Sequence, residues 1–343
     1  MEQEHLPDSN HGNPEIHNAT IHSMKRRMKN KDYRERTIYM ITLVVAGRRK
    51  LFGEIEGDIR SCYGEANYPH IVLSTLGEAV REQILRLPEY YPQLSVSGFQ
   101  IMPDHVHLII FVHDQLPCHL GIVIRGLVQG CNKAYHQLYP QDNAVHIGKG
   151  KSERRSNGIL FEHGYNDKVL MHQNQLKIWR HYLADNPRRL MVKHAHPDYF
   201  RVQRNIKEKG LEFSAIGNLF LLRKPLLQIQ CSRHLTETEI QEMKEKALIA
   251  CASGAVLISP CISPGEKAVM RAVFEKDYPE IVLLENGLTD LAKPGGARFD
   301  ACAKGQLLLL APWEHHTDKR RITRTQCHIL NNMAALLSDG KKL

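Results

Sequence analysis

Residues 96–112 read VSGFQIMPDHVHLIIFV, two apolar runs separated by Pro103 and Asp104. Runs of this length that are rich in β-branched and aromatic residues are typical of strands, and a Pro-Asp pair between them favours a tight turn. The stretch therefore predicts a β-hairpin in the middle of a sheet, with its second strand beginning at His105.

Two histidines, His105 and His107, stand one residue apart at the start of this second strand. Side chains alternate between the two faces of a strand, so both imidazoles point to the same side and can bind one ion. A chain with 20 histidines can also carry such a pair on its surface without function. His194 and His196 have the same spacing, but they lie beside Pro197 with no apolar strand after them. The strand context favours the first pair as metal ligands.

The sequence around the hairpin predicts further strands and helices. Residues 39–45, YMITLVV, predict a buried strand, and another is expected from Ile55 onward or at residues 71–73. Helical spacing of apolar residues predicts three helices, at residues 76–85, 119–139 and 170–184. Pro187 is expected to end the last of them. This order predicts an α+β domain, an antiparallel sheet with helices on one face.

Length and composition indicate two domains, because 343 residues exceed the usual size of one. Residues 1–35 are polar, end in a basic run and predict a flexible tail, and residues 36–204 hold the α+β domain. A charged stretch at residues 201–213 marks the boundary. In residues 205–343 short apolar strands alternate with helices, which predicts an α/β, Rossmann-like domain with a parallel sheet.

The composition favours a polyanionic partner and argues against several other classes of protein. A formal net charge of +9 suits nucleic acid, although an ordinary soluble protein can be this basic. The eight cysteines include no CxxC pair, so neither a zinc knuckle nor a disulfide framework is indicated. No apolar run approaches the roughly 20 residues that cross a bilayer, and the polar N-terminus shows no secretory signal. We therefore expect a cytoplasmic protein with no membrane partner.

Tyr182 and Asn186 are four residues apart on a predicted helix and so lie on one face. A tyrosine hydroxyl, with a pKa near 10, becomes a useful nucleophile when a divalent ion polarises and orients the phosphate that it attacks. Asn186 offers a carboxamide oxygen as a third ligand beside His105 and His107, and two nitrogens with one oxygen suit Mn²⁺ at least as well as Mg²⁺. A tyrosine taken alone is more often a core residue. The prediction of a nucleophile therefore rests on Tyr182 occurring together with Asn186 and the two histidines.

These motifs resemble those of a known family of nucleases. Residues 98–109, GFQIMPDHVHLI, resemble the HUH motif of the single-tyrosine transposases, and residues 182–187, YLADNP, resemble the tyrosine helix of their REP-associated branch. Residues 120–126, LGIVIRG, are similar to the helix that follows the HUH hairpin. The resemblance implies a ferredoxin-like fold, a 5′-phosphotyrosine intermediate with a free 3′-hydroxyl, and recognition of hairpin-forming single-stranded DNA. Asp104 departs from the family, which usually has asparagine there.

Basic residues near these motifs are expected to contact the DNA backbone. Charge and position single out six of them: Arg125, Lys133, Arg154, Arg155, Arg188 and Arg189.

The C-terminal domain offers a candidate anion or nucleotide site. Residues 217–222 and 228–233 resemble the entry to the Rossmann-like domain of DNA-processing protein A, a single-strand DNA binder. Backbone amides at a helix N-terminus favour phosphate, and the expected contacts are Ser232, Arg233, Ser263, Gly265 and Lys267. A helix capped by Ser263, with Pro264 as its first residue, explains the same sequence without a ligand.

Together the motifs predict a metal-dependent single-stranded DNA nickase or strand transferase, a transposase that forms a 5′-phosphotyrosine at Tyr182 with Mg²⁺ or Mn²⁺. Two alternatives stay open. One is a non-catalytic nucleic-acid-binding regulator with a vestigial HUH site; the other is an enzyme that acts on a nucleotide through residues 205–343, with a DNA-targeting N-terminal module. The sequence does not decide whether Tyr182 completes its own site or that of a second copy in a homodimer.

Overall fold

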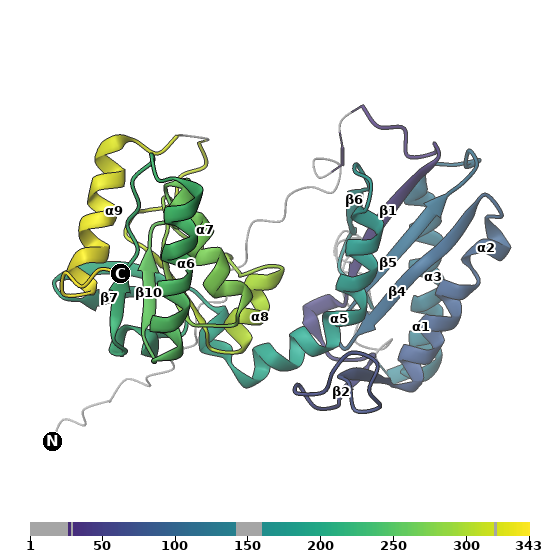
Figure 1. The fold of residues 1–343 in the computed structure, drawn as a ribbon. Helices are drawn as coiled ribbons and strands as arrows, with labels where there is room; N and C mark the ends of the chain where they lie inside the picture. The colour runs from purple at the N-terminus through teal and green to yellow at the C-terminus, as the bar shows by residue number, and fades with distance from the viewer. Residues whose placement is uncertain (1–26, 29, 142–159, 319–320) are drawn as a thin grey trace, which may run out of the picture. The chain divides into compact units, whose positions relative to one another are not determined.

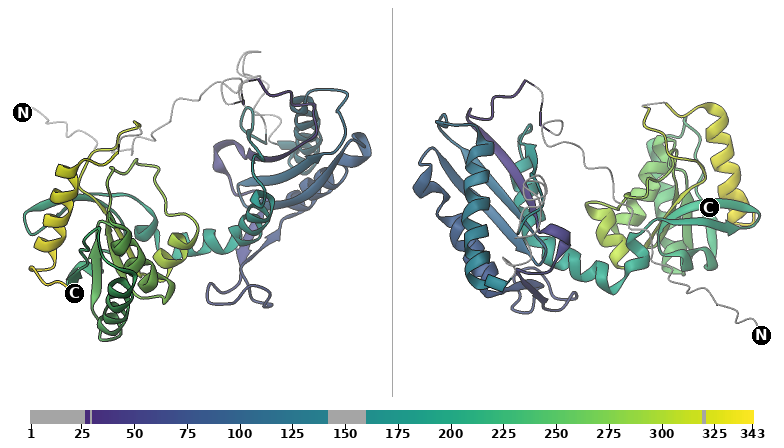
Figure 2. Two further views of the ribbon diagram at one scale, coloured as in Figure 1. Left: turned by 45° about the horizontal axis from the view of Figure 1, so that its top comes forward. Right: turned by 180° about the vertical axis from the view of Figure 1, so that it is seen from behind.

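The computed structural model describes residues 27–28, 30–141, 160–318 and 321–343 (Figures 1 and 2). Contacts divide the chain into two compact units, residues 1–188 and 189–343. This division precedes the boundary predicted at residue 204, and it falls within helix α5, Gln175–Ala195. The charged stretch that predicted the boundary instead contributes to two paired strands, β7 (Gln203–Glu208) and β8 (Leu211–Gly217).

The first unit contains a four-stranded antiparallel sheet with the order β4-β5-β1-β6. Its strands are β1 (Thr37–Val44), β4 (Leu94–Met102), β5 (His105–Val112) and β6 (Asn166–Val169). The predicted hairpin is confirmed, because β4 and β5 pair directly and flank Pro103 and Asp104. With helices α1 and α3, the chain follows the strand-helix-strand-strand-helix-strand succession of ferredoxin-like units.

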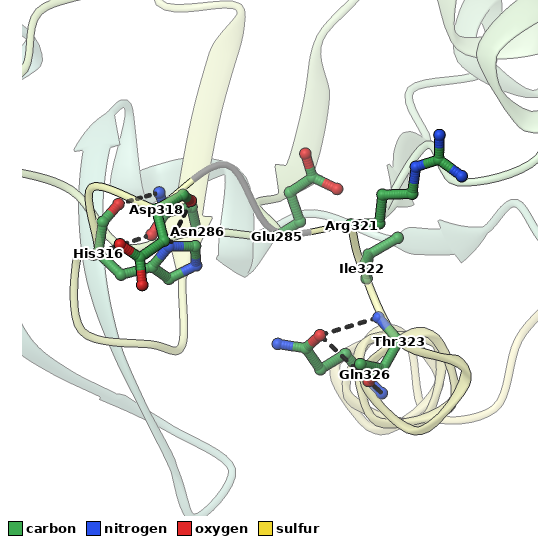
Figure 3. A pocket seen from close by; sticks show the side chains of 8 residues that line it. All are labelled: Glu285, Asn286, His316, Asp318, Arg321, Ile322, Thr323 and Gln326. Atoms are coloured by element: carbon green, nitrogen blue, oxygen red, sulfur yellow. Dashed lines mark hydrogen bonds between the residues drawn. The ribbon is translucent and has the colours of Figure 1, made fainter.

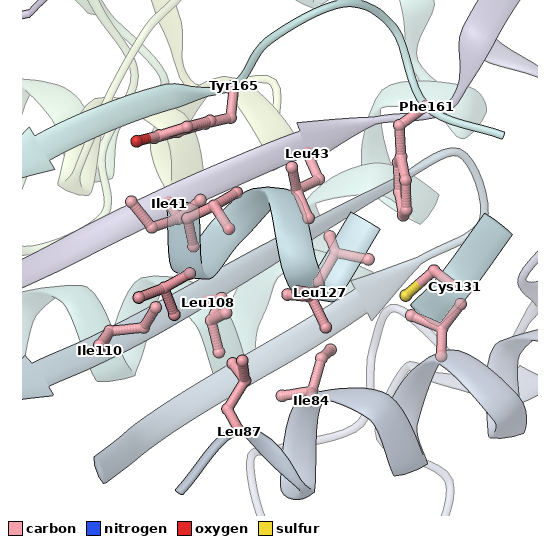
Figure 4. Close-up of a cluster of buried hydrophobic side chains, with 14 of the residues drawn as sticks. Ile41, Leu43, Ile84, Leu87, Leu108, Ile110, Leu127, Cys131, Phe161 and Tyr165 are labelled. Carbon is pink, nitrogen blue, oxygen red and sulfur yellow. The ribbon is translucent and has the colours of Figure 1, made fainter. Parts of the chain in front are cut away.

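One face of this sheet is covered by helices α1 (Thr75–Leu85) and α3 (Leu120–Leu138), with the short helix α2 (Leu87–Tyr90) beside them. Helix α1 begins at Ser74, whose hydroxyl accepts a hydrogen bond from the Gly77 amide. Figure 4 shows the apolar core between the helices and the strands, to which Ile84 and Leu127 contribute from the helices and Ile41, Leu108 and Ile110 from the sheet.

Helix α5 covers the opposite face, so the prediction that all helices lie on one face is wrong (Figure 1). Trp179 and Leu183 pack on Met40 and Ile109, which point away from α1 and α3 because side chains alternate along β1 and β5. The prediction that Pro187 ends this helix is also wrong. Proline removes one backbone hydrogen bond, but buried side chains on both sides of it hold the helix to Ala195.

Two further segments complete the first unit. Strands β2 (Gly53–Glu56) and β3 (His70–Leu73) form a separate antiparallel ladder, so both candidate strands in this region exist. The predicted tail extends too far, because Tyr33 is buried in the core and its hydroxyl donates to Asp167 at 2.7 Å. Arg27 pairs with the same carboxylate, and residues 1–26 and 29 lie outside the described residues.

The second unit contains a six-stranded mixed sheet with the order β7-β8-β12-β11-β10-β9. Four of its strands are parallel: β9 (Leu226–Gln228), β10 (Val256–Ser259), β11 (Glu280–Leu283) and β12 (Leu307–Ala311). Strands β7 and β8 add an antiparallel edge. The expected fully parallel sheet is therefore corrected to a mixed one. The charged residues of β7 and β8 hid this hairpin, since a strand at a sheet edge can expose polar side chains.

Helices connect the parallel strands: α6 (Glu237–Ala252), α7 (Pro264–Glu275) and α8 (Ala297–Ala303). The final helix, α9 (Arg324–Leu337), packs on the face formed by alternate residues such as Val256, Ile258 and Ile281. Figure 1 shows α9 on the other side of strand β10 from α7. Three short 3₁₀ helices are η2 (Ala46–Arg48), η4 (Pro197–Phe200) and η5 (Leu219–Arg223). Within the part of the chain that the structure describes, no helix combines the length and apolarity needed to cross a membrane.

Candidate metal and tyrosine site

The two histidines of β5 lie on the face of the sheet that helix α5 covers. His105 and His107 alternate with the core residues of β5 and share the side of Ile109. The ring of Tyr182 lies 5.7 Å from the ring of His107, centroid to centroid, and the tyrosine is 37% exposed. Tyr182 thus stands beside the histidines of its own chain, which is the arrangement expected if one copy completes the site.

Each imidazole is oriented by a hydrogen bond at Nδ1. His105 Nδ1 lies 2.6 Å from Asp104 Oδ1, and His107 Nδ1 lies 2.9 Å from Thr42 Oγ1 on the neighbouring strand. The two rings are 4.8 Å apart and nearly perpendicular. Histidines that bind metals usually engage their second nitrogen in this way, which fixes the tautomer and the ring direction. In this arrangement Nε2 of each ring is the nitrogen that would bind an ion.

The protonation state of His107 also suits a residue that binds a metal ion. Burial, together with the positive charges of His105, Lys168 and Arg48, lowers the pKa of His107 to about 3. The imidazole is therefore neutral at physiological pH, as metal binding requires. Burial opposes ionisation of Asp104, but the hydrogen bond from His105 and the charges of His105 and Arg48 outweigh it, so the pKa of Asp104 is lowered. Asp104 is the carboxylate that orients His105.

Asn186 supplies the third expected ligand. Its side chain is buried, and among the described residues its Nδ2 atom has no hydrogen-bond partner. The nitrogen and oxygen of a carboxamide are assigned from their surroundings, so an unsatisfied amide position fits an oxygen that would bind a cation. The described residues contain no group of three His, Cys, Asp or Glu side chains that could hold a metal. That Asn186 completes a metal site with the two histidines stays a prediction.

A second hydrogen-bond network, which the sequence did not predict, holds helix α5 beside the histidines. The Tyr68 hydroxyl, from the loop between β2 and β3, donates to Asp185 Oδ1 at 2.8 Å. Arg188 binds both oxygens of the same buried carboxylate, at 2.6 and 3.1 Å. Asp185 lies between Tyr182 and Asn186 on the helix, so the network fixes the turn that carries both. No local pattern links Tyr68 to a residue more than one hundred positions away.

Tyr68→Phe is expected to lower the free energy of unfolding of the first unit by about 1 kcal/mol, because a buried carboxylate loses a donor. Urea denaturation of the full chain measures this change. Tyr63→Phe is the matched control, since Tyr63 stands in the same loop but is 71% exposed. Equal stability of the two variants would show that the Tyr68 hydroxyl does not hold α5.

The predicted DNA contacts of helix α3 are not brought to this site. Arg125 and Lys133 are exposed on α3, which covers the opposite face of the sheet from the histidines. Arg154 and Arg155 lie outside the described residues. On the face of the histidines the structure instead places Lys168, exposed on β6 opposite Met40. Sequence reasoning missed Lys168 because β6 has only four residues and little apolar character.

The two arginines after the tyrosine motif have partners within the protein. Arg188 forms the ion pair with Asp185, and the Arg189 guanidinium lies 3.7 Å from the centroid of the Phe299 ring. Both contacts give these side chains a structural role. Their expected contact with DNA stays a prediction.

The anion site predicted in the C-terminal domain is filled by the protein itself. Ser263 caps α7, and the buried Glu266 carboxylate accepts hydrogen bonds from the backbone amides of Ile262 at 2.6 Å, Ser263 at 3.2 Å and Cys231 at 3.3 Å. A negative charge already occupies the helix N-terminus, so a phosphate there would meet repulsion. A Cβ atom on Gly265 would lie 3.0 Å from Cys231 Cβ, so close packing explains that glycine.

The remaining residues of this predicted site point elsewhere. Ser232 and Arg233 are exposed, and the Ser232 hydroxyl accepts a hydrogen bond from the His234 amide at 3.2 Å. Lys267 is also exposed and lines a cavity between α7 and α8.

Comparison with known proteins finds distant likenesses. No family model matches the chain. An uncharacterized protein of Haemophilus influenzae is 30% identical over 113 residues, which cover 32% of this chain and 57% of that protein. The chain therefore aligns with little more than half the length of this relative.

Two solved structures resemble parts of this chain, with low TM-scores and low sequence identities. DNA processing protein A from Helicobacter pylori, described with a single-stranded DNA binding mode, has a TM-score of 0.31 and 19% identity, covering 41% of this chain and 66% of that chain. A REP-associated tyrosine transposase bound to a REP hairpin has a TM-score of 0.29 and 11% identity, covering 49% of this chain and 74% of that chain. TM-scores this low establish neither fold nor function.

Proposed function

We propose that this protein is a metal-dependent single-stranded DNA nickase and strand transferase of the HUH transposase type, with Tyr182 as its nucleophile. The position of the Tyr182 ring, 5.7 Å from His107 of the same chain, carries the proposal. The two oriented imidazoles and the unsatisfied carboxamide of Asn186 support it. The hairpin-forming single strand is proposed from the resemblance of the sequence motifs.

In this reaction the Tyr182 oxygen attacks the phosphorus of a phosphodiester, and the bond from phosphorus to the 3′-oxygen breaks. The phenolic proton passes to solvent, and the departing 3′-oxygen takes up a proton. The downstream strand stays attached as a 5′-phosphotyrosine, and the upstream strand leaves with a 3′-hydroxyl. Because the covalent bond keeps the energy of the broken phosphodiester, the strands can be rejoined without ATP, as transposition requires.

The residues of the site have distinct tasks. His105, His107 and Asn186 would hold Mg²⁺ or Mn²⁺, which polarises the phosphate and neutralises the charge that develops on its oxygens. Asp104 and Thr42 keep the two imidazoles in place. Lys168 carries a positive charge on the same face of the sheet, where the DNA backbone would pass.

The polarity of cleavage tests this proposal. Single-stranded oligonucleotides from the ends that flank the gene are labelled at the 5′ or the 3′ end and incubated with Mg²⁺ or Mn²⁺. We expect the 3′-labelled fragment to migrate with the denatured protein and the 5′-labelled fragment to be extendable by a polymerase. Release of both fragments free of protein would contradict a tyrosine nucleophile, and tight binding without cleavage would favour the non-catalytic regulator.

A further inference from the structure

The second unit has a cavity of about 940 Å³ on the sheet face between helices α7 and α8. Its apolar wall includes Met270 and Phe274 from α7 and Val282 from β11. A volume in this range, with apolar side chains and convergent polar groups in the wall, is typical of small-molecule sites. The cavity adjoins the N-terminus of α7, since Ile262 and Lys267 belong to its lining, and there the Glu266 carboxylate already accepts the backbone hydrogen bonds that an external anion would take.

A buried carboxylate without a hydrogen-bond partner lines this cavity. Glu280, the first residue of β11, is only 6% exposed, and among the described residues its Oε2 atom accepts no hydrogen bond. Side chains alternate along β11, so Glu280 and Val282 point to the same face. Burial raises the pKa of Glu280 to about 7, and the charge of Arg298 only partly opposes this. An unsatisfied buried acceptor is costly for folding alone, so it indicates a ligand that donates hydrogen bonds.

The rim of the cavity carries positive charge. Lys267, Arg271 and Arg298 line it and are exposed, and none of the three forms an ion pair with a carboxylate in the described part of the chain. They outnumber the two exposed carboxylates of the lining, Glu275 and Glu285. These exposed cations therefore favour an anionic group on the ligand.

A neighbouring hollow of about 590 Å³ (Figure 3) has no buried carboxylate without a hydrogen-bond partner among its described lining residues. It shares Glu285 and Ile322 with the larger cavity. The amide of Asn286 in its lining is satisfied within the protein, because Asn286 Nδ2 donates to the His316 carbonyl at 2.9 Å and Asn286 Oδ1 accepts from the His316 amide at 3.1 Å. Of the two, the larger cavity is thus the one whose lining contains a buried acceptor, Glu280 Oε2, without a hydrogen-bond partner among the described residues.

We propose that the cavity between α7 and α8 binds an aminated nucleobase with its phosphate, with Glu280 accepting from the exocyclic amino group. A flat ring fits the apolar wall of Met270 and Phe274, and the phosphate meets the cations of the rim. The ionised form of this carboxylate discriminates an amino group from a carbonyl at the same ring position, since it can only accept and only the amino group donates. The nucleotide is either free or part of a single strand.

Pairs of nucleotides that differ in one group test this site in the full chain. Isothermal titration with CMP against UMP, and with AMP against IMP, compares an amino group with a carbonyl at one ring position. We expect the amino member of at least one pair to bind about tenfold more tightly, and Glu280→Gln to remove this preference. Glu242→Gln, an exposed change on α6, is the matched control and should keep it.

The outcomes distinguish a free nucleotide from a nucleotide within a strand, and they distinguish both from failure of the proposal. If a short deoxycytidine oligonucleotide binds with the same dependence on Glu280 but CMP does not, the nucleotide belongs to a strand. If no nucleotide or oligonucleotide binds, or if the preference persists in Glu280→Gln, the proposal is overturned. Neither result depends on Tyr182, so this test is independent of the nickase.

The stability of the ligand-free protein provides a second measurement. The pKa of Glu280 is higher in the folded protein than in the unfolded chain, so its contribution to stability is present at low pH and is lost as the pH rises through about 7. Glu280→Gln should therefore melt about 5 °C above the wild type at pH 8 and close to it at pH 4.5. A variant that melts lower at pH 8 would show that Glu280 serves the fold rather than a ligand.

Discussion

Tyr182→Phe is expected to lower the yield of the covalent protein–DNA adduct by about 10⁴-fold or more, because the attacking oxygen is removed. The ring of Tyr182 lies at the surface beside His107 and is 37% exposed, so losing its hydroxyl leaves the apolar contacts of α5 intact. Binding of DNA and of metal should therefore change little. Denaturing gels measure the adduct, and fluorescence anisotropy with a labelled single strand measures binding.

Tyr90→Phe is the matched control for this change. Tyr90 is 59% exposed on helix α2, which lies beside α1 and β4 rather than beside the histidines. This variant should form the adduct at the wild-type rate. An adduct that survives in Tyr182→Phe at a comparable rate would assign the nucleophile to another residue.

His107→Ala is expected to reduce metal-dependent cleavage by about 10³-fold, because one of the two proposed imidazole ligands is lost. His107 is the more buried of the two, and Thr42 fixes its ring. Titration calorimetry should show that Mn²⁺ binding is weakened by at least about tenfold. Removing the metal from the wild-type protein with a chelator should reproduce the loss of cleavage, and added Mn²⁺ should restore it.

His194→Ala controls for the general loss of a histidine. His194 belongs to the pair with the same sequence spacing, but it is exposed near the end of helix α5, and His196 stacks on Tyr199. Its removal should leave metal binding and cleavage unchanged. If His194→Ala and His107→Ala lose activity equally, the site at β5 is not the metal centre.

The hairpin that presents the histidines could be predicted from the sequence because its determinants are local. Alternation along residues 105–112 fixes which side chains share a face, and the turn at Pro103 and Asp104 fixes the pairing with β4. The spacing of Tyr182 and Asn186 likewise places both on one face of α5.

The rest of the site depends on contacts between distant segments. The side of the sheet on which α5 packs is decided by Trp179 against Met40 and Ile109, and helical periodicity alone cannot reveal it. Strand pairing places Thr42 opposite His107 and Lys168 opposite Met40 on the same face, and no local pattern specifies either position. The role of Glu266 is hidden for a related reason: its position in the sequence suggests a surface helix residue, whereas its buried carboxylate accepts a hydrogen bond from the Ser263 amide at the start of α7.

The most direct test of the central claim is mass spectrometry of the protein after reaction with a single-stranded oligonucleotide from the flanking ends, in Mn²⁺ or Mg²⁺. Trypsin should release residues 181–188, HYLADNPR, because cleavage follows Arg180 and Arg188. After nuclease trimming, we expect this peptide to carry a nucleotide joined through its 5′-phosphate to Tyr182. A nucleotide on any other residue, or an unmodified peptide with both ions on authentic flanking strands, would contradict the account.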